Sequence, residues 1–100
     1  MKRRNLVYAS TAEADLLSLH SQIASASSFV IATRYIERIE AFCASFDLAA
    51  ERGAARDDLM PGLRIVGFER RITIAFTVDD ETVTFLRFFY GGQDWDSAFD

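Results

Sequence analysis

The sequence is poor in the residues that mark several protein classes. Its 100 residues include one cysteine, one proline, one histidine and five glycines. A single cysteine excludes an internal disulfide, on which small secreted domains commonly depend. So few glycines and prolines exclude collagen-like and low-complexity chains. The longest apolar runs are a few residues long, far short of the roughly 20 that a membrane-spanning helix needs.

What the sequence does contain is enough apolar material for one core. Half of the residues are hydrophobic, and nine of the aromatic residues are phenylalanines. A chain of this length has room for one domain, expected over residues 1–100. Polar residues interrupt the segment after the charged start at 1–4, so no signal-peptide core follows it. We therefore expect a soluble, cytoplasmic protein.

The charge is acidic overall but uneven along the chain. The net charge is −4 and the pI is near 4.9, which is the wrong sign for a general nucleic-acid binder. Residues 62–76 contain three arginines and one glutamate, a net charge of +2. Residues 79–100 contain six acidic residues and one arginine, a net charge of −5.

The first half of the chain predicts a strand followed by two helices. Residues 4–9 are typical of a short strand that ends at Ser10. Ser10 and Glu13 match a capping box, in which Ser10 caps a helix and Glu13 reaches back to it. Apolar residues recur at helical spacing over 12–26 and again over 32–46, with a serine-rich break between them that offers a new N-cap. Two amphipathic helices with so short a connection are expected to form an antiparallel hairpin.

The second half predicts three strands. Residues 47–62 have no periodicity and are expected to form a loop. The apolar period then changes to two, which predicts strands over 63–68, 72–78 and 82–90. The order β-α-α-β-β-β indicates an α+β fold, with the helical hairpin packed on a small antiparallel sheet.

The last predicted strand is apolar on both faces. Arg87 is surrounded there by Phe85, Leu86, Phe88 and Phe89, and the face that it occupies is left open by the sequence. A strand of this kind is covered on both sides or presents one side to a partner. Since only two helices are expected, we predict that one sheet face lacks intramolecular cover and needs an obligate partner.

Sequence patterns of enzymes are weak in this chain. Gly91 and Gly92 follow a strand but open no clear helix and precede no Lys-Ser/Thr pair. Cys43 lies on the apolar stripe of the second helix and is expected to be a core thiol. His20 is expected at the hairpin surface, and the acidic turn at 79–81 is expected to be solvated. We expect no metal site and no cofactor.

The arginines of the predicted sheet are the more informative set. Arg64, Arg71 and Arg87 fall on or directly next to three consecutive predicted strands and could converge, with Arg70 beside them. The alternative is that strand alternation places them on a solvent face, paired with acidic side chains. The sequence leaves both alternatives open.

Two sequence blocks resemble a known family. Residues 56–64 read RDDL-x-PGLR and residues 86–94 read LR-x-x-YGGQD, and Tyr8, Glu13 and Asp15 fit the same pattern. In this order they resemble the ParE branch of the RelE/ParE toxin superfamily. The resemblance implies the toxin of a type II toxin–antitoxin pair, with the fold already expected. It also implies a ParD-like antitoxin with a DNA-binding ribbon-helix-helix part and a disordered segment that folds across the toxin.

The superfamily implies two activities, between which the residues help to choose. RelE-like members resemble ribosome-dependent mRNA endonucleases, whose chemistry needs a base, an acid and cations at the phosphate. The sheet and tail offer Arg64, Arg71, Arg87 and Tyr90 but no Lys or His, and the acidic tail repels phosphate. ParE-like members resemble DNA gyrase inhibitors that act by binding protein. We expect this second, non-enzymatic activity, with RNA cleavage as the alternative.

Two sets of contact residues follow as hypotheses. Acidic side chains of the antitoxin, which would also cover the apolar sheet face and the hairpin groove, are expected to bind four arginines: Arg64, Arg70, Arg71 and Arg87. Three aromatic residues near the C-terminus are expected to contact the target: Tyr90, Trp95 and Phe99. The alternative for Trp95 and Phe99 is that they fold back onto the core.

Overall fold

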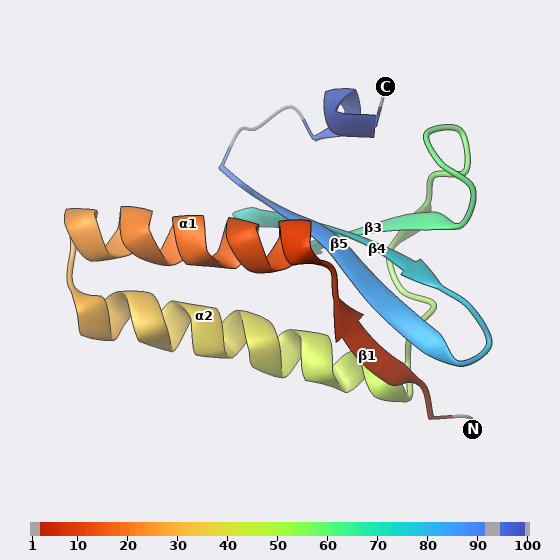
Figure 1. Ribbon diagram of the computed structural model, residues 1–100, viewed down its shortest axis with the longest axis horizontal. Helices are drawn as coiled ribbons and strands as arrows, with labels where there is room; N and C mark the ends of the chain where they lie inside the picture. Colours follow the sequence, from red (N-terminus) through yellow and green to blue (C-terminus); the bar gives the residue numbers. More distant parts are fainter. Residues whose placement is uncertain (1–2, 92–94, 100) are drawn as a thin grey trace.

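The computed structural model describes residues 3–91 and 95–99 and arranges them as a helical hairpin on a sheet (Figure 1). The elements in chain order are β1 (Asn5–Tyr8), α1 (Ser10–Ala26), α2 (Phe29–Ala44), η1 (Ser45–Asp47), β2 (Ala54–Ala55), β3 (Leu63–Phe68), β4 (Ile72–Val78), β5 (Thr82–Tyr90) and η2 (Asp96–Phe99). In this part of the chain, no helix combines the length and the apolar character that a membrane crossing requires. The α+β class and the three long strands are confirmed.

The sheet is mixed, whereas the sequence predicted an antiparallel one. Its strand order is β1-β5-β4-β3-β2, and β1 runs parallel to β5 while the other neighbours are antiparallel. The hairpin lies between β1 and the rest of the sheet in the sequence, and a connection of that length allows a parallel pairing. The two-residue strand β2 was not predicted, because two exposed alanines have no period to detect.

The helix starts confirm one predicted cap and contradict the other. Ser28 is the N-cap of α2, and its hydroxyl accepts a hydrogen bond from the backbone N–H of Ile31 at 3.1 Å. The predicted capping box at Ser10 is wrong, since Ala9 is the N-cap of α1 and makes no side-chain bond. The Ala9 N–H donates to the Phe85 carbonyl at 2.9 Å. That bond extends the contact between β1 and β5 up to the helix start.

The main core fills the space between the hairpin and the sheet. Phe46, Phe76 and Phe85 are fully buried there, and the Phe46 ring meets each of the other two edge to face at 5.1 and 5.5 Å. Such contacts add to the large apolar area that each phenylalanine buries. Cys43 belongs to the same cluster, which confirms it as a buried thiol.

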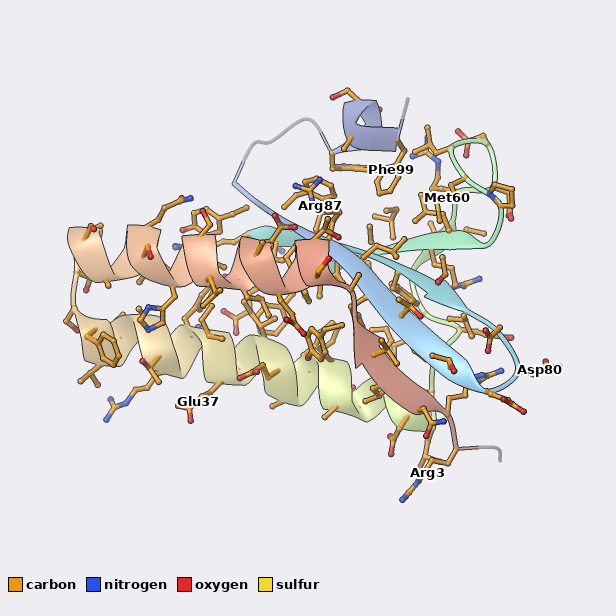
Figure 2. All side chains as sticks on the ribbon, in the orientation of Figure 1. Arg3, Glu37, Met60, Asp80, Arg87 and Phe99 are labelled. Carbon is orange, nitrogen blue, oxygen red and sulfur yellow. The ribbon has the colours of Figure 1, made fainter. Side chains whose placement is uncertain are left out.

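A second, smaller core lies on the other face of the sheet, and it overturns a prediction. Leu63, Ala75 and Phe89 are buried there. They are covered by side chains from the loop before β3 and from the tail: Leu59, Met60, Trp95 and Phe99. Figure 2 shows Met60 and Phe99 together on this side of the sheet. The expectation that this face lacks intramolecular cover is therefore wrong, because two segments without periodicity supply it.

Candidate protein-binding groove

The helical hairpin extends beyond the end of the sheet (Figure 1). A groove lies there between the two helices and the end of the sheet. Its volume is about 680 Å³. The apolar walls come from Ile23 on α1 and Ile31 on α2. Arg71 and Tyr90, at the start of β4 and the end of β5, line the side that the sheet forms. The arrangement combines apolar walls with a basic and an aromatic side chain at the sheet end, which suits a peptide segment of a protein partner.

An ion pair closes the polar end of this groove. Arg38 of α2 donates from Nε and Nη2 to the two carboxylate oxygens of Glu69, at 3.1 and 3.0 Å. The hydrogen bonds from Arg38 hold the pKa of the Glu69 carboxyl below its usual value. The Arg38 guanidinium also lies 4.8 Å from the centre of the Tyr35 ring, close enough for a cation–π contact. Helix α2 and the β3–β4 turn are thereby tied together at the groove.

Tyr35 and the β3–β4 turn are the two unusual features of this end. The Tyr35 hydroxyl is buried and has no hydrogen-bond partner among the residues that the structure describes. Glu69 and Arg70 have φ values of 50° and 60°, a left-handed conformation that non-glycine residues rarely adopt. The sequence signalled neither, since Tyr35 fitted the core stripe and the turn lacks the Asn-Gly pair typical of its geometry.

The four arginines predicted to bind the antitoxin do not converge. Arg71 lines the groove and Arg70 lies in the turn beside it. Arg64 lies near the other end of β3, where its Nε donates to the Arg52 carbonyl at 2.9 Å. Arg87 pairs in register with Ala75, which faces the second core. Their role in antitoxin binding stays a prediction.

Arg87 is held on the face away from the hairpin core. Its Nε and Nη2 donate to the Asp15 carboxylate at 2.7 and 3.2 Å, and its guanidinium lies 4.7 Å from the centre of the Phe89 ring. Asp15 also accepts the backbone N–H of Phe88 at 2.9 Å. The alternative that the sheet arginines pair with acids therefore holds for Arg87.

The three aromatic residues predicted to contact the target also separate. Tyr90 lines the groove and packs against the main core. Trp95 and Phe99 pack against the second core, where the Phe99 ring is 6.2 Å from that of Phe89. Folding back is therefore what the structure shows for Trp95 and Phe99, and a target contact by these residues remains a prediction. Gly92, Gln93 and Asp94, part of the sequence block at 86–94, lie outside the described residues.

The remaining reactive side chains occupy structural positions. Within residues 3–91 and 95–99, no cluster of three or more His, Cys, Asp or Glu could hold a metal ion. Burial raises the pKa of the Cys43 thiol to about 11, which keeps it protonated and unreactive at neutral pH. The His20 ring is hydrogen-bonded to the Thr33 hydroxyl at 3.0 Å and packs edge to face on Phe29.

Comparison with known proteins identifies the family. None of the curated proteins matches this chain. Among solved structures, it is similar to one described as "Chromosomal ParDE TA system from P. aeruginosa", with a TM-score of 0.77 over 89% of this chain and 97% of that one. At 22% identity, that similarity shows the fold alone. The model of the family described as "ParE toxin of type II toxin-antitoxin system, parDE" matches residues 6–95. Since that match spans most of the sequence, the chain belongs to the ParE family of type II toxin–antitoxin toxins.

Proposed function

We propose that this toxin is neutralised by a ParD-like antitoxin that occupies the groove, and that it acts in the cytoplasm by binding and inhibiting DNA gyrase. The membership in the ParE family supports both partners. The groove between the hairpin and the sheet is the observation that carries the antitoxin part. It is large enough for several side chains of a peptide segment.

Exposed apolar side chains next to the groove support a protein partner. Phe29, Val30 and Ile31, at the start of α2, are 70%, 56% and 52% exposed. Three consecutive exposed apolar residues beside an apolar groove are unusual on a monomer and mark an interaction surface. Ile31 belongs to both features, so a segment that enters the groove would also cover part of this patch.

The spread of the arginines favours protein binding over RNA cleavage. A ribonuclease must gather cations around one phosphate to stabilise the developing charge. Here Arg64, Arg71 and Arg87 lie at two ends and on both faces of the sheet, and Arg87 is already paired with Asp15. The His20 ring, which could act as a base, lies on α1 and contacts α2. These positions support a non-enzymatic inhibitor.

The proposal is tested with the purified full chain in two assays. In a gyrase supercoiling and cleavage assay, we expect loss of supercoiling and accumulation of broken DNA. Addition of the antitoxin encoded by the neighbouring gene should restore gyrase activity. A parallel assay on translating ribosomes should leave the mRNA intact. Cut mRNA together with unaffected gyrase would contradict the proposed target and favour the RelE-like alternative.

A further inference from the structure

The polar end of the groove combines several features that point to one kind of ligand group. We propose that Tyr35 and Arg71 form a subsite for a carboxylate of the antitoxin, with the Tyr35 hydroxyl and the Arg71 guanidinium as the two donors. This inference rests on the proposed function, because it takes the antitoxin as the occupant of the groove. The two donors would select an acidic side chain of the antitoxin at the polar end of the groove.

The first observation is the buried hydroxyl of Tyr35. The residue is only 8% exposed, and within the described residues its hydroxyl has no hydrogen-bond partner. Buried polar groups are almost always hydrogen-bonded, since an unpaired one costs stability. Tyr35 lines the groove, so a group that enters there is the partner that its position allows. An unpaired donor of this kind is typical of a site that is completed by binding.

The second observation is the charge around that hydroxyl. Burial and then the nearby Glu69 carboxylate raise the pKa of Tyr35, whereas Arg71 and Arg38 act in the opposite direction. Tyr35 lines the groove together with these charged residues, and the Arg38 guanidinium is 4.8 Å from the centre of its ring, which places Tyr35 at the polar end.

The two arginines at this end differ in what they bind. Arg38 is engaged by Glu69 in a two-point ion pair. The Arg71 side chain forms no ion pair or hydrogen bond with the described part of the chain, although its backbone pairs with Phe68 and Gly91. An arginine only donates hydrogen bonds, so the group that joins Arg71 and Tyr35 must be an acceptor, and an anionic acceptor gains most.

The turn between β3 and β4 supports the same assignment. Glu69 and Arg70 adopt a strained left-handed conformation, and the turn places Glu69 against Arg38 at the polar end of the groove, which Arg71 also lines. Backbone strain of this kind is retained where the surrounding structure enforces it, and it is frequent at ligand-binding positions. Because Arg38 is paired with Glu69, Arg71 is the cation of the groove that is available to a partner.

The rest of the groove defines what accompanies the carboxylate. Ile23 and Ile31 form apolar walls next to the polar end. We therefore infer that the antitoxin inserts an acidic residue with an apolar residue within about one helical turn of it, so that both are accommodated together. A purely acidic segment would leave the apolar walls exposed, and the chain as a whole, at a net charge of −4, would repel it.

The test uses the full chain and the antitoxin encoded by the neighbouring gene, with binding measured by calorimetry. We expect the Tyr35→Phe and Arg71→Gln variants to bind at least about 10-fold more weakly, as a hydrogen bond to a charged group predicts. Arg34→Gln, at an exposed arginine of α2 outside the groove, should bind within about twofold of the wild type. Antitoxin variants with each acidic residue changed to its amide should include one whose loss is not additive with Tyr35→Phe.

Thermal unfolding separates a binding role of Tyr35 from a structural one. Because the hydroxyl is buried and unpaired, its removal in Tyr35→Phe should leave the melting temperature unchanged or raise it. A lower melting temperature would show that the hydroxyl is bonded in the free protein and would overturn the inference. Wild-type affinity in both groove variants would overturn it as well, while the proposed function would stand. Failure of the wild-type chain to bind the antitoxin would overturn both.

Discussion

At the scale of single residues, the side chains of α1 continue the hydrogen bonding of a strand edge. Strand β1 ends at Tyr8, which pairs with Phe85 of β5. Within the described part of the chain, the residues of β5 after Phe85 therefore have no strand beside them on that edge. The Thr11 hydroxyl donates to the Leu86 carbonyl at 2.8 Å, and Asp15 accepts the Phe88 N–H. Two helix side chains thus satisfy backbone groups that an open edge leaves unpaired.

Asp15 should therefore be a stability residue rather than a binding residue. It accepts three hydrogen bonds and is 19% exposed, against 33% for its partner Arg87. We expect Asp15→Ala to lower the free energy of unfolding by about 2 kcal/mol, because Arg87 and the Phe88 N–H both lose their acceptor. Urea denaturation measures the change, and a double-mutant cycle with Arg87→Ala should show strong coupling.

The control for this prediction is an ion pair of similar geometry at the surface. Arg56 also donates two hydrogen bonds to one carboxylate, that of Asp58, but Asp58 is well exposed. Asp58→Ala should therefore cost clearly less stability than Asp15→Ala. Equal losses at both positions would show that Asp15 contributes no more than a surface pair. If Arg87→Ala weakened antitoxin binding without destabilising the chain, Arg87 would be free for a partner, as the sequence suggested.

At the scale of elements, the β3–β4 hairpin combines strong strands with an unfavourable turn. Phe68 pairs with Ile72 at the end of the ladder, and the chain reverses through Glu69 and Arg70 with both φ values positive. A tight turn of this kind favours Asn-Gly, because side chains with a Cβ are strained in the left-handed region. The pairing of β3 with β4 and the Arg38–Glu69 contact evidently outweigh that strain.

Arg70→Gly should stabilise the toxin. Glycine adopts a φ of 60° without strain, so the free energy of unfolding should rise by about 0.5–1 kcal/mol. Arg70→Ala is the matched variant, since it removes the same charge but keeps the Cβ, and no gain is expected from it. Thermal and urea unfolding of both variants measure the difference. Equal behaviour of the glycine and alanine variants would show that the turn is not strained at this residue.

The tail over residues 95–99, which contains η2, is the segment whose contribution the sequence left most open. Trp95 packs on the second core and under the Arg56 guanidinium, whose centre is 5.2 Å from the ring. Trp95→Ala should lower the free energy of unfolding by about 1–2 kcal/mol through lost apolar contact, and Trp95→Phe should restore part of it. A variant that is as stable as the wild type but no longer inhibits its target would instead support the predicted target contact.

At the scale of the whole molecule, periodic segments were predictable and the arrangement between them was not. The strands at 63–68, 72–78 and 82–90 follow directly from a two-residue period. Their pairing includes a bulge, because Ala75 pairs with Arg87 and Phe76 with Phe85, which leaves Leu86 as an extra residue. That extra residue lets β5 direct Phe85 and Phe88 to one core and Phe89 to the other.

The candidate groove could be predicted only in part, because it too is formed by segments that lie far apart in the sequence. The sequence predicted Arg71 as an antitoxin contact and Tyr90 as a target contact, and the structure places both residues in one groove. Both contacts stay predictions. Tyr35, by contrast, fitted the apolar stripe of its helix, and only the packing of α2 against the β3–β4 turn shows its unpaired hydroxyl. The cover on the second face was missed for a related reason, because residues 56–60 and 95–99 have no period that predicts where they pack.

The exposed apolar patch at the start of α2 (residues 29–31) should contribute to binding in the toxin–antitoxin complex. Ile31 is half exposed in the free chain and also lines the groove, and its backbone N–H donates to the Ser28 hydroxyl that caps the helix. Ile31→Ser leaves that backbone bond intact and removes apolar area, so antitoxin binding should weaken by roughly 10-fold, in line with the apolar area that a partner buries at such a side chain.

Leu48→Ser is the control, because Leu48 is also exposed but follows η1, away from the groove. Binding calorimetry at several temperatures should give a negative heat-capacity change for the wild type and a smaller one for Ile31→Ser. Equal affinities for the two serine variants would show that the antitoxin covers another surface of the toxin.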